Sequence, residues 1–210
     1  MPNTEILIAF LIATAVFAYM PGPSTLYAAA QTIARGRQSG LMAAFGIHIG
    51  GYVHVVAAAL GLAVLFESVP MIYSGMKMAG AGYLIWLGFR FILTTRTISE
   101  HSLPQIEKKS KRRAFFESAI VEILNPKTAI FYVAFLPQFT DPTALLPLWG
   151  QLLILGMIVN VMFSSADLLC VVLAERLTSA FRRSPTSTKW VNRIGGGVLI
   201  GLGTNLAASK

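Results

Sequence analysis

Charged residues are scarce in this sequence. Only 12 % of its 210 residues are Asp, Glu, Lys or Arg and 55 % are hydrophobic, whereas a soluble domain carries about 25 % charged residues. So little charge argues against a soluble enzyme and equally against a disordered chain. We therefore predict a polytopic membrane protein. At about 20 residues per helical span, the length allows roughly six crossings and no appended soluble domain.

Several other features are rare or missing. The single cysteine, Cys170, lies in an apolar stretch, which excludes an intramolecular disulfide and gives no redox motif. No HExxH, GxSxG or paired-aspartate motif is present, which argues against an intramembrane enzyme. His48 and His54 have no Cys, Asp or Glu at ligand spacing, so neither a metal site nor a cofactor is predicted. No Lys or Arg precedes Arg35, so we expect the first hydrophobic run to be retained rather than cleaved as a signal peptide.

Apolar runs bounded by charges or by Pro and Gly clusters recur along the whole chain. As helices they are long enough to cross about 30 Å of hydrocarbon, and they lack the period-two alternation of barrel strands. We expect an all-α membrane protein with six transmembrane helices, at about 5–29, 40–66, 69–93, 115–136, 146–174 and 190–207.

These runs are expected to form one polytopic domain, 1–210, made of two halves. Residues 1–94 and 115–210 each contain three runs, and an odd number of spans makes any internal repeat inverted in the membrane. The polar, basic segment 95–114 is the natural connector between the halves.

Most of the basic residues lie in alternate loops. The net charge of +8 would suit nucleic-acid binding, but that interpretation fails because these residues do not gather on one polar face. By the positive-inside rule the connector 95–114 is cytoplasmic and both termini lie outside the cytoplasm, while the opposite loops carry Glu67 and Asp141. Of the 17 Lys and Arg residues, 14 lie in or beside the three basic loops: Arg35, Arg37, Arg90, Arg96, Lys108, Lys109, Lys111, Arg112, Arg113, Arg176, Arg182, Arg183, Lys189 and Arg193.

The first and fourth runs are interrupted by prolines at corresponding positions of the two halves. Pro21-Gly22-Pro23 interrupts the first and Asn125-Pro126 the fourth. A proline frees the carbonyl four residues earlier, which in hydrocarbon must find another partner. Kinks for packing alone are one explanation, but matched broken helices are also typical of a transporter's midplane binding site. Candidate substrate-binding residues are Pro21, Gly22, Pro23, Ser24, Glu122, Asn125, Pro126 and Lys127.

Ionisable side chains within the runs are candidates for function because they are costly in a membrane. A half-helix that begins near Ser24 or Thr128 suits a substrate carboxylate. Glu122 and Lys127 flank the second break. Glu122 is a candidate for binding a substrate ammonium or a proton, and Lys127 for binding a carboxylate; the alternative is an ion pair that fixes the break. In the fifth run, Asp167 shares one face with Asn160 and Ser164 at i, i+4, i+7 spacing. It is a candidate proton carrier or a hydrogen-bond partner of another helix. The candidates for proton coupling are Asp167, Glu122 and His48.

Glycines spaced four residues apart predict close helix contacts. Gly46, Gly50 and His54 form one stripe, for which packing is the favoured interpretation. His48 and His54 can titrate near neutrality, although a neutral, hydrogen-bonded histidine is more common. Gly197 and Gly201 give a second small-residue face, for packing within the chain or against another subunit.

The motifs together resemble the LysE/RhtB family of amino-acid exporters over nearly the whole chain. The resemblance rests on the Pro-Gly-Pro motif, Asn125-Pro126-Lys127, the segment 135–139 (FLPQF), and glycines such as Gly36 and those of segment 80–88. It implies export of a small amino acid such as lysine, arginine, threonine, homoserine or leucine, coupled to the proton gradient. Many family members carry an acid directly after Pro-Gly-Pro, where this chain has Ser24.

We therefore expect a multi-pass protein of the bacterial inner membrane that exports a small amino acid or derivative. Its expected partners are the amino acid, protons, the lipid bilayer and a second copy of the chain in a homodimer, with no nucleic acid. The alternative is a channel or a structural membrane subunit, and an enzyme is not expected. Charges beside broken helices speak against a passive scaffold.

Overall fold

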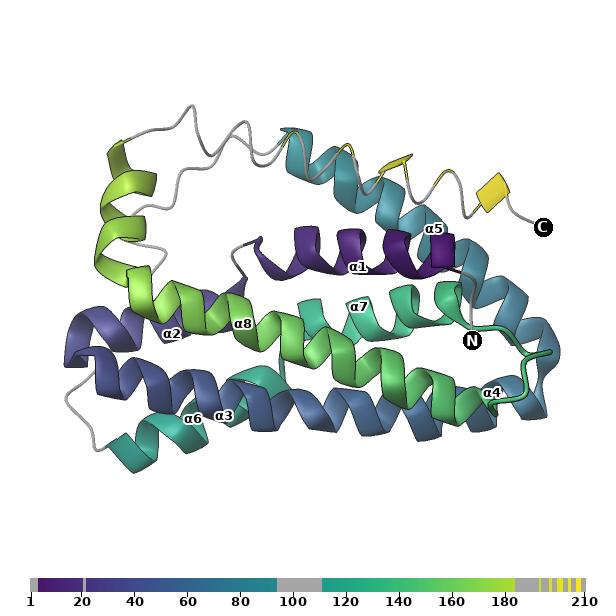
Figure 1. Ribbon diagram of the computed structural model, residues 1–210, viewed down its shortest axis with the longest axis horizontal. Helices are drawn as coiled ribbons and strands as arrows, with labels where there is room; N and C mark the ends of the chain where they lie inside the picture. Colours follow the sequence, from purple (N-terminus) through teal and green to yellow (C-terminus); the bar gives the residue numbers. More distant parts are fainter. Residues whose placement is uncertain are drawn as a thin grey trace.

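The computed structural model describes residues 4–20, 22–93 and 111–183, together with isolated positions beyond 183. Within these ranges the regular elements are helices, most of which run along the longest axis of the molecule (Figure 1). In chain order they are α1 (Thr4–Ala18), α2 (Pro23–Arg35), α3 (Arg37–Val56), the π-helix η1 (Ala57–Leu62), α4 (Ala63–Ser68), α5 (Pro70–Leu93), α6 (Lys111–Ile123), α7 (Pro126–Phe135), the 3-10 helix η3 (Leu136–Phe139) and α8 (Leu148–Arg183).

Two pairs of consecutive helices are bent at a proline. The axes of α1 and α2 differ by 46° and those of α6 and α7 by 45°. Pro23 and Pro126 are the first residues of α2 and α7, where a missing N–H costs no helical hydrogen bond. The residues before them, Gly22 and Asn125, have extended backbones, as a following proline requires. The bends fall where the sequence predicts the breaks, although Pro21 itself lies outside the described residues.

Within the described ranges, two helical stretches are long and apolar enough to cross a membrane. They are Arg37–Leu65 and Leu148–Ala174, and the number rises to four if each bent pair forms one span. The helix α5 covers the third predicted run, and the sixth, 190–207, lies almost entirely outside the described residues. The helical fold class is thus confirmed for the described chain, while six spans in two inverted halves stay a prediction.

The helix ends differ from the predicted runs. The first basic loop is reduced to Gly36, whose φ of 82° is readily adopted by glycine, so α2 and α3 are almost continuous in sequence. The expected loop after the fifth run is helical up to Arg183, because its Leu, Ala, Glu and Arg residues are good helix formers. The π-helix η1 within the second run was not predicted, since an extra residue in one turn has no signal in the apolar pattern.

An aromatic cluster packs the first half of one bent pair against the second half of the other. The Phe17 ring of α1 stacks on the Phe131 ring of α7 with centroids 4.0 Å apart, and Phe131 stacks on Phe135 at 4.3 Å. Phe10 of α1 packs against Phe135 and Phe139 at 5.7 and 5.3 Å. All five side chains are buried, so this cluster fixes α1 beside α7.

Glycines allow α3 to approach α6 closely. A Cβ atom at Gly46 would collide with the Phe115 carbonyl oxygen, and one at Gly50 would lie 2.6 Å from the Ala119 carbonyl oxygen. No side chain fits between these backbones, so the small-residue stripe of the second run brings α6, and with it Glu122, against α3.

Two basic segments of the described chain lie at one end of the molecule. The junction of α2 with α3 and the start of α6 are at the left in Figure 1, while the junction of α4 with α5 and the segment between η3 and α8 are at the right. Arg35, Arg37, Arg112 and Arg113 belong to the left-hand segments, and Asp141 belongs to a right-hand one. This separation of charge is the one that the positive-inside rule uses, and it is consistent with the predicted orientation.

Candidate functional site

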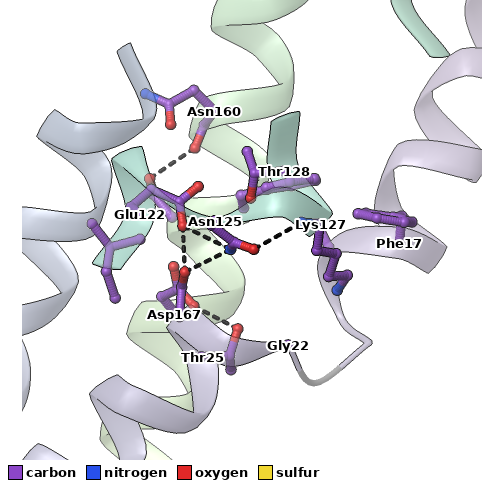
Figure 2. A pocket seen from close by; sticks show the side chains of 14 residues that line it. Phe17, Gly22, Thr25, Glu122, Asn125, Lys127, Thr128, Asn160 and Asp167 are labelled. Atoms are coloured by element: carbon purple, nitrogen blue, oxygen red, sulfur yellow. Dashed lines mark hydrogen bonds between the residues drawn. The ribbon is translucent and has the colours of Figure 1, made fainter. Parts of the chain in front are cut away.

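A pocket lies beside both helix breaks, and its walls come from both halves of the chain. Three of its side chains are ionisable: Glu122, Lys127 and Asp167 (Figure 2). The rest of the wall mixes apolar side chains with hydroxyls and amides. The complete lining is Phe17, Ala18, Gly22, Ser24, Thr25, Ile47, Glu122, Asn125, Lys127, Thr128, Asn160, Phe163, Ser164 and Asp167.

Lys127 connects the start of α7 to the other break. Its Nζ donates to the carbonyl oxygen of Met20, 3.1 Å away, and lies 4.4 Å from the centre of the Phe17 ring. Carbonyls at a helix end lack partners within the helix, and an aromatic face attracts a cation. Lys127 therefore makes this bridge and not the ion pair with Glu122 that the sequence left as one alternative.

A second connection runs in the opposite direction, from the start of α2 to the end of α6. The Ser24 hydroxyl donates to Glu122 Oε2. Asn125 Nδ2 donates to the same carboxylate oxygen at 3.1 Å and to Ser24 Oγ at 2.9 Å. All three side chains are buried, so this network holds the Glu122 carboxylate at the point where the two breaks face each other.

Side chains also replace the backbone hydrogen bonds that the second break removes. Asn125 Oδ1 accepts from the Lys127 backbone N–H at 3.0 Å and so caps α7. The Glu122 carbonyl, freed by Pro126, accepts from the Asn125 N–H at 2.9 Å and lies 2.8 Å from Nε2 of His54 in α3. Because a carbonyl can only accept, His54 Nε2 is the donor. The sequence predicted the freed carbonyl but not His54 as its partner.

Asp167 lies on the α8 side of the pocket. The Thr25 hydroxyl in the first turn of α2 donates to Asp167 Oδ1 at 2.7 Å. Asp167 is 3 % exposed, as is Glu122, and no described basic side chain pairs with it. Asn160 and Ser164, which the spacing places on the same helix face, line the pocket with it.

His48 belongs to α3. It contacts Asn160 and Ser164 of α8 but does not line the pocket. Its Nδ1 is 2.6 Å from Ser164 Oγ, and its backbone carbonyl accepts from Asn160 Nδ2 at 3.1 Å. The Ser164 hydroxyl in turn donates to the Asn160 carbonyl at 2.7 Å. Because a hydroxyl has one proton to donate, this arrangement makes His48 Nδ1 the donor to Ser164.

The predicted residues divide into those that line the pocket and those that shape it. Five of the eight substrate-binding candidates line it, together with the proton-coupling candidate Asp167. Pro23 and Pro126 are exposed at the first positions of α2 and α7 and form the breaks. Pro21 lies outside the described residues. The five that line it are Gly22, Ser24, Glu122, Asn125 and Lys127.

The sequence interpretation missed much of the wall. Thr25 was not named, although it lies two residues after Pro23, as Thr128, named as the start of a half-helix, lies two residues after Pro126. Phe17, Ile47 and Phe163 carry no such signal, since each belongs to an apolar run and only the packing of helices brings them to the pocket.

Two further predictions concern glycines and metals. Gly197 and Gly201 are helical and exposed, and a Cβ at either would meet nothing within 4 Å, so their packing role stays a prediction. In the part of the chain that the structure describes, no group of three or more His, Cys, Asp or Glu side chains could hold a metal ion.

Comparison with known proteins gives matches along almost the entire chain. The family model of the LysE type translocators matches residues 15–210. An uncharacterized membrane protein of Vibrio cholerae is 30 % identical and covers 99 % of both chains. A homoserine/homoserine lactone efflux protein of Salmonella typhimurium is 29 % identical over 96 % of both chains. A leucine efflux protein of the same organism is 32 % identical over 64 % of this chain and 63 % of its own. No solved structure matches significantly.

The match confirms the resemblance seen in the motifs. It covers the bent pair formed by α6 and α7, most of the bent pair formed by α1 and α2, and every residue that lines the pocket. With its apolar helices, the chain is a multi-pass protein of the inner membrane. It belongs to the family of LysE type translocators.

Proposed function

We propose that this protein is a secondary transporter that exports a small amino acid, or a close derivative, in exchange for protons. The observation that carries the proposal is the pocket between two bent helix pairs, which holds one ammonium and two carboxylates. A zwitterion needs both signs of charge. Relatives named as homoserine and leucine efflux proteins support this substrate class.

The substrate carboxylate is assigned to the Lys127 side of the pocket. Lys127 Nζ exchanges its bond to the Met20 carbonyl for the incoming anion. The start of α2 is close by, because a Cβ at Gly22 would lie 2.9 Å from Nζ. Within α2 the hydrogen bonds begin with the Leu26 N–H, so the N–H groups of Ser24 and Thr25 have no partner in their own helix and favour an anion.

The substrate ammonium and the proton compete for the carboxylates on the opposite side. Glu122 and Asp167 are buried, and an empty pocket that carries both as anions beside one lysine has an uncompensated negative charge. A proton neutralises that charge in the absence of substrate, and an ammonium group replaces the proton when substrate binds. This competition couples export to proton entry. The side chain of the substrate then contacts the apolar wall formed by Phe17, Ile47 and Phe163.

Alternating access follows from movement of the two halves around the pocket. Residues 1–94 and 115–210 are the proposed inverted halves of the single domain, with the basic connector 95–114 in the cytoplasm and both termini outside. The bends of 46° and 45° give each half a broken helix at corresponding positions. In this proposal the protein works as a homodimer, in which each chain has its own pocket.

The first test is export from cells loaded with dipeptides that release threonine, homoserine, leucine, lysine or arginine. We expect one of these amino acids to appear outside faster when the protein is present, and a protonophore to abolish the effect. Lys127→Ala removes the ammonium from the pocket and should abolish export. Arg37→Ala removes an exposed positive charge away from the pocket and serves as the matched control.

The outcomes separate the alternatives. Export that neither saturates nor responds to a protonophore indicates a channel. If the wild-type protein is present in the membrane and releases none of the five amino acids, the proposed substrate class is wrong. Equal loss of export in Lys127→Ala and Arg37→Ala would point to a defect in insertion rather than in substrate binding.

A further inference from the structure

We propose that α2 carries a second binding subsite, for the carboxylate of the exported amino acid, around the guanidinium of Arg35 at its cytoplasmic end. This inference rests on the proposed function, since it concerns the route by which the substrate reaches the pocket. The subsite lies apart from the pocket, whose lining on α2 ends at Thr25.

A polar stripe along one face of α2 leads from the pocket to this subsite. Ser24, Tyr27, Gln31 and Arg35 are separated by three or four residues and therefore lie on one side of the helix. Ser24 bonds Glu122, and the Tyr27 hydroxyl donates to Glu117 Oε2 at 3.1 Å, so both meet α6. At 1.5 Å per residue the stripe is about 16 Å long. It extends from the middle of the molecule to its basic end.

The far end of the stripe contains buried polar atoms without partners. Gln31 is fully buried and its Nε2 donates to the Tyr27 hydroxyl at 2.8 Å, but its Oε1 has no hydrogen-bond partner. Nε, Nη1 and Nη2 of Arg35 are also buried, and none has a partner in the described chain. A buried guanidinium without an acceptor is costly, and this helix face offers five such donors and one free acceptor.

The charges around Arg35 favour an anion. Arg35 lies close enough to Tyr27 for electrostatic interaction, and Tyr27 contacts Glu117. The Glu117 carboxylate also pairs with Arg113, whose Nε lies 2.7 Å from Oε1. Arg113 thus neutralises the Glu117 carboxylate, and no acidic side chain in the described chain forms an ion pair with Arg35. A planar carboxylate fits the fork of a guanidinium with two parallel hydrogen bonds, and Gln31 Oε1 can then accept from the ammonium of the same zwitterion.

Burial distinguishes an amino-acid substrate from a lipid headgroup as the occupant. The guanidinium nitrogens are covered by the protein, whereas lipid phosphates reach only its outer surface. The subsite is therefore closed in this structure and becomes accessible when α2 and α6 separate. The bond between Tyr27 and Glu117, which joins these two helices, must break for the substrate to enter.

The test compares transport in the two directions. Inside-out membrane vesicles present the cytoplasmic face to radiolabelled homoserine or leucine, and right-side-out vesicles present the other face. In Arg35→Gln we expect the KM for uptake into inside-out vesicles to rise about tenfold, the effect of losing a charge-assisted hydrogen-bonded pair, with an unchanged maximal rate. The KM in right-side-out vesicles should not change. Arg35→Lys keeps the charge but not the planar fork of donors. Its KM in inside-out vesicles should therefore lie between those of the wild type and Arg35→Gln.

Arg37→Gln is the matched control, because it removes an equal charge two residues further on, at the start of α3, from an exposed side chain. Its KM should equal that of the wild type. If Arg35→Gln does not reach the membrane, Gln31→Met replaces it, with the same directional rise in KM expected from loss of the free acceptor.

Three outcomes overturn the subsite. They are an unchanged KM in Arg35→Gln, an equal change in both vesicle orientations, or a change that follows the fraction of anionic phospholipid in reconstituted vesicles, which would make lipid phosphate the occupant. A wild-type protein that moves neither amino acid nor any other member of the class instead overturns the proposed function itself.

Discussion

Lys127 donates a hydrogen bond to the carbonyl oxygen of Met20, 3.1 Å away, and so joins the first turn of α7 to the end of α1. Ser24 makes the reciprocal connection, from the first turn of α2 to Glu122 at the end of α6. Each broken helix thus sends one polar side chain to the other break. Any motion that separates the two halves must break both connections, and a substrate with an anionic and a cationic group can replace both.

Gly22→Ala should weaken the first of these connections. A Cβ at this position would lie 2.9 Å from Nζ and 3.0 Å from Cδ of Lys127. The flexible lysine will move away and lose its bond to Met20 and its contact with Phe17. We expect the maximal export rate to fall at least tenfold, and the free energy of unfolding to fall by about 1 kcal/mol, the value of one hydrogen bond.

Export assays and thermal unfolding in detergent measure these two effects. Gly82→Ala is the control, because a Cβ at Gly82 would meet nothing within 4 Å. If Gly22→Ala exports at the wild-type rate, the position of Lys127 does not matter for transport.

His54→Ala should destabilise the second break. The substitution leaves the buried Glu122 carbonyl, which Pro126 has freed from α6, with only the Asn125 N–H as a partner. Losing a buried hydrogen-bond partner costs about 1–3 kcal/mol, so the melting temperature should fall. His54→Gln keeps a donor and should recover part of the loss. An unaltered melting temperature in His54→Ala would mean that the carbonyl finds another partner.

The positions of the breaks were predictable from the sequence because their cause is local. Proline removes one N–H and restricts the residue before it, whatever the rest of the chain does. The partners of the freed groups were not predictable. His54 is 68 positions from Glu122 in the sequence, and Met20 is 107 from Lys127. Only the packing of helices brings each pair together.

The same distinction applies to the pocket. Intramembrane charge singled out Glu122, Lys127 and Asp167, because the cost of burying charge is visible in any apolar run. It did not show that Lys127 turns to a carbonyl and an aromatic ring instead of to Glu122. The direction of a side chain at a helix break depends on backbone geometry that residue spacing does not contain.

Gly46→Ala and Gly50→Ala should test the contact between α3 and α6. The added methyl groups would collide with the carbonyl oxygens of Phe115 and Ala119, which are backbone atoms and cannot rotate away. Overpacking of this kind costs about 1–3 kcal/mol. Each variant should therefore melt at a lower temperature than the wild type. Gly61→Ala is the control, because a Cβ at Gly61 would meet nothing within 4 Å, and it should have the melting temperature of the wild type. The same melting temperature in all three variants would contradict the contact between α3 and α6.

Asp167→Asn should separate transport from proton coupling. The amide keeps the size of the side chain and can still accept from Thr25, which now donates to Oδ1 at 2.7 Å, but it cannot carry a proton. We therefore expect the variant to release amino acid down its own concentration gradient at a rate that a protonophore does not alter. Export against a gradient should be lost. Glu5→Gln, a change at an exposed residue in the first turn of α1, should behave like the wild type.

Glu122→Gln distinguishes the two buried carboxylates. Because Ser24 and Asn125 both donate to Glu122 Oε2, its charge is compensated by hydrogen bonds to a greater extent than that of Asp167, which has the single bond from Thr25. The less compensated carboxylate gains more from taking up a proton. We therefore expect Glu122→Gln to raise the KM for the amino acid while protonophore sensitivity remains. If Glu122→Gln loses protonophore sensitivity and Asp167→Asn keeps it, Glu122 is the proton carrier.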